Sequence, residues 1–274
     1  EPEVIAGVSV GALNGVMGAA RRYQTLRTIW HSITEDEVYG SGRELRLLAQ
    51  AALWKMGIAP APMGYRSNDP LRDLLEEVLD GVELDAVFRA GRVSLQTQQF
   101  VSETDPDTLV EACLASTSVP VYVPPVEFHG QQWVDGGVRT ISPLGELLAY
   151  SPDRIVIINT QALKETPKNP DKNAPWAGSI LDVAKEAVGI MTSEIFNEDV
   201  RRYLELNSLV KEAEAQGATL TRGDKTLKAY DTLLIEPKRP LRPGTVFDRD
   251  VLDVQYEMGA TAARNALQAH PEWT

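Results

Sequence analysis

Cysteine is nearly absent from this chain, because Cys113 is the only one among its 274 residues. An internal disulfide is therefore excluded, which fits a reducing compartment without requiring one. Histidine is scarce as well, with three in the chain. No cluster of His and Cys residues is available to bind a metal ion, and we expect neither a metal nor another cofactor.

The chain also lacks an excess of basic residues and long apolar runs. It has 27 Lys and Arg against 39 Asp and Glu, a net charge of −12, with no basic block. This excludes a nucleic-acid partner and argues against electrostatic attraction to anionic lipid, although apolar contacts could still dock the protein on a membrane. No run reaches the ~18 apolar residues of a transmembrane helix, and no signal peptide is visible. We expect a protein that is cytoplasmic or peripheral to a membrane. Secretion is not excluded, because the true start of the chain is expected to be missing.

What the sequence does contain is an alternation of strand and helix patterns. This predicts an α/β fold with helices on both faces of a buried sheet. No repeat or linker interrupts the chain, so residues 1–274 are expected to form one domain. We expect helices at 12–27, 69–79, 106–117, 179–215 and 250–268, strands at 3–6, 91–104, 155–158 and 232–235, and a hairpin with its tip at 129–130.

The segment "GVSVG" at residues 7–11 matches the pattern G-x-S-x-G. In a nucleophile elbow, this serine stands on a sharp turn between a strand and a helix, and Gly7 and Gly11 are expected to be small so that the turn can close. The helix that follows would offer free N–H groups to a developing oxyanion. Ser9 is therefore a candidate nucleophile. The plainer alternative is a turn of small residues that packs a helix on a strand; a dinucleotide-binding loop does not fit, because Ala12 replaces the third glycine.

A serine nucleophile needs a base, and Asp135 is the best placed candidate. It stands in "WVDGG", where Gly136 and Gly137 would let the backbone turn tightly beside the carboxylate. The alternatives are that Asp-Gly is only the exit turn of a hairpin, or that His270, four residues from the end, completes a Ser-Asp-His triad. His31 follows Trp30 in a helical pattern and His129 sits at a hairpin tip, so neither is expected to be essential.

Taken together, "GVSVGALNG", "ACLASTSVPVYVPPVEFHGQQWVDGG" and "WVDGGVRTISPL" resemble the patatin-like phospholipase family, of the bacterial type. The resemblance implies an α/β sandwich whose central, mostly parallel sheet is flanked by helices. It also implies a serine lipid acyl hydrolase of the phospholipase A or lysophospholipase type, without a cofactor or metal. Ser9 would attack a lipid or other acyl ester, Asp135 would take its proton, and the Val10 N–H would be one oxyanion donor.

One departure from the family concerns the oxyanion loop. Family members carry a glycine-rich loop before the nucleophile, whereas residues 1–6, "EPEVIA", contain no glycine. We therefore expect that the first strand and its loop are missing from this chain; "YGSGR" at 39–43 is an alternative source, although Ser41 and Glu44 fit a helix capping box better. Two other functions stay open: a catalytically silent lipid-binding or scaffold protein, and a thioesterase or acyltransferase with the same dyad. The oligomeric state is also open.

The segment 45–63 is rich in large apolar residues. Leu45 and Leu48 are expected to pack in the core. Trp54, Met56 and Met63 lie toward the loop end of the segment, where we expect them to be exposed and to form a lipid-facing wall of the site.

Overall fold

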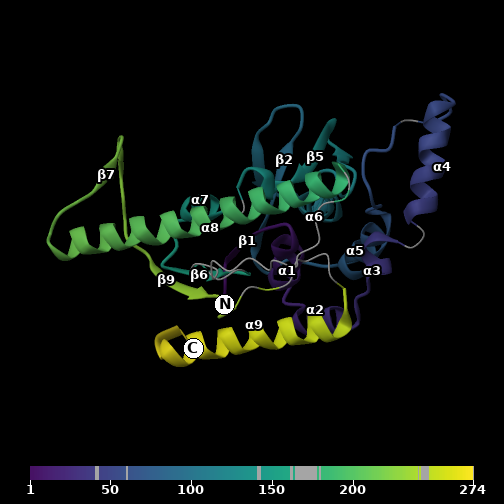
Figure 1. Cartoon of the computed structure of the whole chain (residues 1–274). Coiled ribbons are helices and arrows are strands. Elements are labelled where there is room, and N and C mark those ends of the chain that lie inside the picture. The colour runs from purple at the N-terminus through teal and green to yellow at the C-terminus, as the bar shows by residue number, and fades with distance from the viewer. Residues whose placement is uncertain are drawn as a thin grey trace. The chain divides into compact units, whose positions relative to one another are not determined.

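The computed structural model describes residues 1–40, 43–59, 61–140, 143–160, 163, 178, 180–239, 241 and 247–273 (Figure 1). The chain divides into two compact units, one made of Glu1–Glu146 with Trp176–Phe196 and the other of Leu147–Pro175 with Asn197–Thr274. A single domain over the whole chain stays a prediction. Within the part of the chain that is described, no helix combines the length and apolarity needed to span a membrane.

The first unit is built on a five-stranded sheet. Its strands are β1 (Val4–Val8), β2 (Val87–Ser94), β3 (Phe100–Glu103), β4 (Val126–Phe128) and β5 (Gln131–Asp135). The order is β1-β2-β5-β4, and β3 also pairs with β2. The α/β class predicted from the sequence is confirmed. β1 runs parallel to β2 with Val8 opposite Gly91, which places the end of β1 at the middle of β2.

The sheet is mixed, and the expectation of a mostly parallel sheet is wrong for this unit. β2–β3, β2–β5 and β4–β5 are all antiparallel. Two of these pairs, β2–β3 and β4–β5, are joined by short turns, and neighbouring strands joined by a few residues must run in opposite directions. The segment 91–104, expected as one strand, bends between Ser94 and Phe100 into a hairpin. The hairpin predicted around His129-Gly130 is confirmed, and both tip residues have the positive φ that such a turn requires.

Helices of the first unit are α1 (Val10–Ala19), α2 (Tyr23–Ser32), α3 (Glu35–Tyr39), α4 (Arg43–Lys55), α5 (Asp69–Leu79) and α6 (Leu109–Ser116), with short 3₁₀ turns at Pro106–Thr108 and Gly136–Val138. α1 packs closely on β1 and β2. A Cβ added at Gly15 would lie 3.2 Å from side-chain atoms of Ile5 and Phe88, and one at Gly18 would lie 3.3 Å from Ile5. Small residues therefore set the distance between the helix and the strand from which it emerges.

The helix expected over 12–27 is interrupted. α1 ends at Ala19 and α2 begins at Tyr23, because Arg21 takes a left-handed conformation with φ of 53°. The Arg22 N–H then donates to the Met17 carbonyl at 2.8 Å, a helix-ending bond of the Schellman type. Arg21 also forms ion pairs with Glu1 and Asp85. The hydrophobic pattern alone gave no sign of this stop, since neither glycine nor proline marks it.

The second unit holds a parallel pair of strands. β6 (Arg154–Ile158) pairs with β9 (Asp231–Ile235). The other elements are a two-stranded ribbon of β7 (Thr221–Arg222) and β8 (Lys225–Thr226), α9 (Arg249–Ala269) and a 3₁₀ turn at Pro271–Trp273. α7 (Leu144–Leu148) and α8 (Ile180–Ala215) have residues in both units. From α8, Tyr203 bonds the Thr232 hydroxyl at 2.7 Å and Asn207 makes two 2.8 Å bonds to the backbone of Tyr230.

Most of the other expected elements are confirmed. α5 covers 69–79, α6 lies within 106–117, α8 is one helix over 180–215, and α9 covers 249–269. The strands at 155–158 and 232–235 are also present, but β6 is buried only at alternate residues: Ile155 and Ile157 are buried, whereas Val156 and Ile158 are exposed. The expected capping box at Ser41 lies outside the described residues.

Candidate functional site

Ser9 stands on the turn that joins β1 to α1. Its backbone has φ of 57° and ψ of −133°, a combination that a non-glycine residue rarely adopts, and its side chain makes no cap on the helix that follows. Strain of this kind amounts to roughly 1–3 kcal/mol and persists only where the surroundings hold the residue in place. A strained strand–turn–helix serine is the geometry of a nucleophile elbow. The local geometry thus matches the turn expected from the sequence motif.

The two glycines of the motif differ in their steric surroundings. A Cβ added at Gly7 would lie 2.2 Å from the carbonyl oxygen of Gly11 and 2.7 Å from the nitrogen of Ala12. Gly7 is therefore required by the close return of the backbone. A Cβ added at Gly11 would meet no described atom within 4 Å. The expectation that both positions must be small is right for Gly7, and for Gly11 the described part of the chain gives no steric reason.

Asp135 ends β5 and is 3% exposed. Burial raises the pKa of its carboxyl from 3.8 to about 7, although hydrogen bonds from the Gly137 N–H and the Ser9 side chain lower it. The Gly137 N–H donates to Oδ1 at 2.8 Å. The Ser9 side chain therefore lies close enough to the Asp135 carboxyl to lower its pKa. The structure brings together the two residues that the sequence analysis selected from positions 126 apart.

Gly136 allows the loop after Asp135 to lie against β2. A Cβ added at Gly136 would lie 2.6 Å from the carbonyl oxygen of Gly91, a backbone contact that leaves no room for a side chain. Gly137 contributes the N–H bond to the carboxylate described above. Both glycines of the Asp-Gly-Gly sequence thus act on the position or charge of Asp135.

Val10 is the first residue of α1. The first N–H groups of a helix have no partner inside the helix, and the helix dipole favours negative charge beside them. The Ser9 N–H, in contrast, is engaged, because it donates to the Ser116 hydroxyl at 3.0 Å. The Val10 N–H therefore stays the expected oxyanion donor at this turn. Ser116 was not selected from the sequence, since a serine near the end of an apolar helix carries no motif.

A second group that the sequence analysis missed surrounds Arg66. Its guanidinium lies 5.3, 5.9 and 5.8 Å from the ring centroids of Tyr39, Tyr65 and Tyr122. The Arg66 side chain is 5% exposed and forms an ion pair with Glu35. A buried cation that is both paired and faced by aromatic rings is well compensated.

Tyr39 links this aromatic group to the candidate site. Burial is the main cause that raises the pKa of its hydroxyl, and the neighbouring Tyr122 raises it further. The Asp135 carboxylate is among the smaller causes that act in the same direction. The Tyr39 hydroxyl therefore stays protonated at neutral pH.

None of the three histidines shows a catalytic setting in the contacts of the described residues. His129 has φ of 51° at the hairpin tip, and its ring centroid lies 5.2 Å from that of Phe128. His31 lies on the partly exposed helix α2. His270 follows α9 and its Nδ1 lies 3.2 Å from Glu272. That Asp135, and not a histidine, serves Ser9 stays a prediction.

The apolar side chains selected near α4 are exposed. Trp54, Met56 and Met63 have exposed fractions of 51%, 62% and 51%. Leu48 was expected in the core, which is wrong, because it is 70% exposed. The Leu45 side chain lies outside the described part of the chain. A role of this surface in lipid binding stays a prediction.

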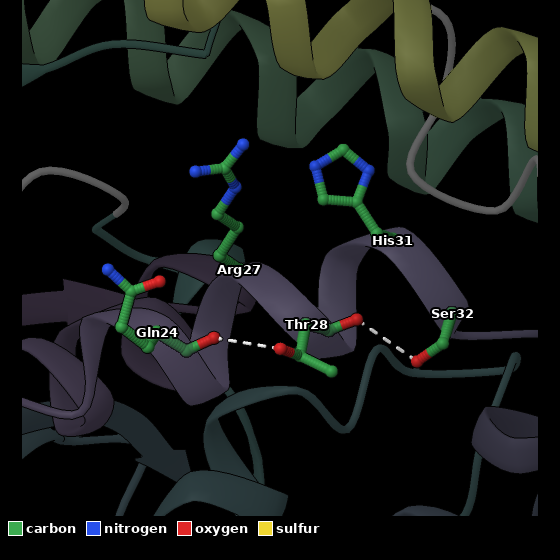
Figure 2. A pocket seen from close by; sticks show the side chains of 5 residues that line it. All are labelled: Gln24, Arg27, Thr28, His31 and Ser32. Carbon is green, nitrogen blue, oxygen red and sulfur yellow. Dashed lines mark hydrogen bonds between the residues drawn. The ribbon is translucent and has the colours of Figure 1, made fainter.

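A hollow of about 430 Å³ lies elsewhere in the first unit, along α2 (Figure 2). It is lined by Gln24, Arg27, Thr28, His31 and Ser32. The Thr28 and Ser32 hydroxyls donate to carbonyls one turn earlier in the same helix, at 3.0 and 3.1 Å. Two of its polar groups are thus used locally, and neither Ser9 nor Asp135 borders it. We assign the candidate site to the dyad because the strained serine and the buried carboxyl meet there.

Ser9, strained on a strand–turn–helix and close to the buried Asp135 carboxyl, has the backbone geometry of a nucleophile elbow. Comparison with known protein families matches residues 1–148 to the family described as patatin-like phospholipase. This chain belongs to that family, and the matched residues include Ser9 and Asp135. Comparison with curated proteins finds no match. The residues after 148 lie beyond the matched range.

The contrast between the two motif glycines gives a first prediction. Gly7→Ala should lower the free energy of unfolding by more than about 2 kcal/mol, because its methyl group must displace backbone. Gly11→Ala, in the first turn of α1, should be neutral or stabilise by up to about 1 kcal/mol, because alanine favours helix. Urea unfolding followed by circular dichroism measures both. Similar losses in the two variants would contradict this account of the turn.

The burial of Asp135 gives a second prediction. Its pKa is higher in the folded protein than in the unfolded chain, so the folded state binds more protons between pH 4 and pH 7. Ionisation therefore destabilises the fold as the pH rises through this range, by at most about 4 kcal/mol. Asp135→Asn, which cannot ionise and keeps an oxygen for the Gly137 N–H, should be more stable than the parent at pH 8 and similar to it at pH 4.

Urea unfolding at the two pH values tests this prediction. Asp107→Asn is the matched control, because Asp107 is an exposed aspartate in the same unit. Its loss measures the effect of removing an exposed carboxylate at each of the two pH values. If Asp135→Asn raises the free energy of unfolding by the same amount at both pH values, ionisation of Asp135 does not destabilise the folded protein.

Proposed function

We propose that this protein is a serine lipid acyl hydrolase, of the phospholipase A or lysophospholipase type, that uses Ser9 and Asp135 as a catalytic dyad. Membership of the patatin-like phospholipase family supports a carboxylic ester hydrolase that acts on lipids. The observation that carries the proposal is that a strained Ser9, on a strand–turn–helix, lies close enough to the buried Asp135 carboxyl to lower its pKa. A serine whose task was only to pack a helix on a strand would gain nothing from this arrangement.

The geometry supports a two-step reaction. Ser9 Oγ attacks the ester carbonyl carbon while the Asp135 carboxylate takes the hydroxyl proton, and the negative oxygen of the tetrahedral intermediate accepts a bond from the Val10 N–H. Asp135 returns the proton to the departing alcohol, which leaves an acyl group on Ser9. Water then attacks the acyl carbon as Asp135 takes its proton, and the proton returns to Ser9 Oγ as the fatty acid leaves. No step requires a metal or cofactor.

The pKa of Asp135 suits this role. A general base works best when its pKa lies near the working pH, since it is then largely deprotonated and still accepts a proton readily. The value of about 7 meets this condition, whereas an exposed aspartate, with a pKa near 4, would be a weak base. Burial of the carboxyl is thus what fits Asp135 to activate a hydroxyl group.

Labelling with a fluorophosphonate tests the proposal directly. We expect one adduct, mapped by mass spectrometry to Ser9, and none in Ser9→Ala. The labelling rate should rise with pH around a midpoint of about 7, because only deprotonated Asp135 can act as base. At pH 5 the rate should be roughly 100-fold lower than its plateau at high pH. Asp135→Asn should label at least roughly 100-fold more slowly than the parent at pH 8.

The controls separate the dyad from a triad and from a silent protein. His129→Ala and His270→Ala should keep most of the labelling rate and most of the hydrolysis of a soluble ester. A collapse in His270→Ala would favour a Ser-Asp-His triad. An adduct that survives Ser9→Ala would overturn the nucleophile assignment, and a correctly folded parent that neither labels nor hydrolyses esters would identify a lipid-binding protein without turnover.

We also propose that Trp54, Met56 and Met63 contact lipid, either as an apolar wall for the acyl chain or where the protein meets a membrane surface. All three are exposed, and an indole ring is suited to the boundary between water and lipid. The proposal needs no electrostatic attraction to the membrane, which the net charge of −12 would oppose. It depends only on burial of apolar side chains in lipid.

Trp54→Ala should lower the activity on long-chain phospholipid vesicles by roughly fivefold or more, because about half of a large ring loses its apolar partner. The activity on a short soluble ester and the melting temperature should change little. Tyr23→Ala is the matched control, because Tyr23 is 49% exposed on α2 in the same unit. Equal losses on both substrates, together with a large fall in melting temperature, would place Trp54 in the core of the protein.

A further inference from the structure

The backbone N–H of Ser9 donates a 3.0 Å hydrogen bond to the hydroxyl oxygen of Ser116, which lies 107 residues away in the sequence. The same hydroxyl donates to the carbonyl oxygen of Gly91 at 2.6 Å. Ser116 is the last residue of α6 and is fully buried. Its side chain thus joins the elbow, the end of α6 and the central strand β2.

The direction of these bonds is fixed by chemistry. A backbone N–H can only donate and a carbonyl can only accept, so the Ser116 hydroxyl accepts from Ser9 and uses its one hydrogen on Gly91. Both roles of the hydroxyl are therefore occupied by backbone groups. Ser116 has no proton to exchange with a substrate, and its contribution to the site lies in where it holds Ser9.

The chain just after α6 also contacts Asp135, the second member of the proposed dyad. The backbone N–H of Asp135 donates to the carbonyl oxygen of Ser118 at 2.9 Å. Gly91, which accepts from Ser116, is also the residue against which Gly136 packs. The end of α6 therefore holds the backbone of Ser9 on one side and of Asp135 on the other.

We propose that Ser116 is a positioning residue for the nucleophile, an inference that rests on the proposed function of Ser9. The strained backbone of Ser9 needs surroundings that hold it in place. The Ser116 hydroxyl supplies one such restraint at the Ser9 peptide, and it keeps the Ser9 side chain directed to the Asp135 carboxyl while the Val10 N–H stays available. Without this restraint, the elbow can relax toward a less strained conformation in which the nucleophile is displaced.

Ser116→Ala removes the hydroxyl and leaves the backbone otherwise unchanged. A displacement of about 1 Å in a reacting group costs on the order of 10²-fold in rate, so we expect fluorophosphonate labelling of Ser9 to be roughly 10- to 100-fold slower per folded molecule. The kcat on a soluble ester should fall by a similar factor with little change in KM. The pH midpoint should stay at that of the parent, because Ser116 does not bond the Asp135 carboxyl.

Thr117→Val is the matched control. The Thr117 hydroxyl lies one residue along the chain and donates to the Cys113 and Leu114 carbonyls of its own helix, at 3.2 and 3.0 Å. Its loss should lower the melting temperature without slowing the labelling. Ser116→Thr, which keeps a hydroxyl, should recover most of the rate. If Ser116→Ala does not fold, Ser116→Cys should fold and show an intermediate loss, because a thiol is a weaker hydrogen-bond partner.

Hydrogen exchange supplies a readout that needs no activity. The peptide that contains the Ser9 amide should exchange at least roughly tenfold faster in Ser116→Ala than in the parent, and Thr117→Val should match the parent. Folded Ser116→Ala with the parent's labelling and exchange rates would overturn the inference. If the parent itself does not label at Ser9, the proposed function fails, and the exchange rates alone then decide whether Ser116 holds the elbow.

Discussion

The burial of the Asp135 carboxyl is the constraint on which the rest of the site depends. A carboxyl group shielded from water resists ionisation, and the hydrogen bonds from Gly137 and Ser9 offset only part of this effect. A general base works best when its pKa lies near the working pH, so this residual rise supports the role that we propose for Asp135. Burial of the carboxyl also requires the glycine that follows it. The backbones of Gly136 and Gly91 lie so close together that a side chain on Gly136 would not fit.

A second constraint acts on Ser9, the proposed nucleophile, and it is independent of the burial of Asp135. A strained backbone at Ser9 has no local hydrogen bond from its own side chain to hold it. The bonds that fix it come from distant parts of the chain, through the Ser116 hydroxyl and the β2 backbone. Burial thus sets the pKa of Asp135, whereas the Ser116 hydroxyl restrains the backbone of Ser9. The two effects come from different groups, and both act near the end of α6.

Much of this arrangement was predictable from the sequence. Gly7, Ser9 and Asp135 stand in patterns whose chemistry is specific, and regular helices such as α5 and α9 follow from apolar periodicity. The mixed sheet was missed, because strand direction depends on how turns close and not on composition. The break at Arg21 carries neither Gly nor Pro, and Leu48 has the helical spacing of a core residue although it is exposed. Ser116 and Arg66 could not be selected, since their roles exist only through residues far away in the chain.

The separation of 107 residues between Ser9 and Ser116 has a consequence for how the site comes into being. Contacts between distant residues form only after the intervening chain has been ordered, because closing such a loop costs entropy that local structure does not repay. In this protein, β2, β3 and α6 lie within that interval. A chain on the way to its native state can already hold a helix after Ser9, yet it has no dyad. The Ser9 elbow therefore takes its strained form only once β2 and α6 have packed around it.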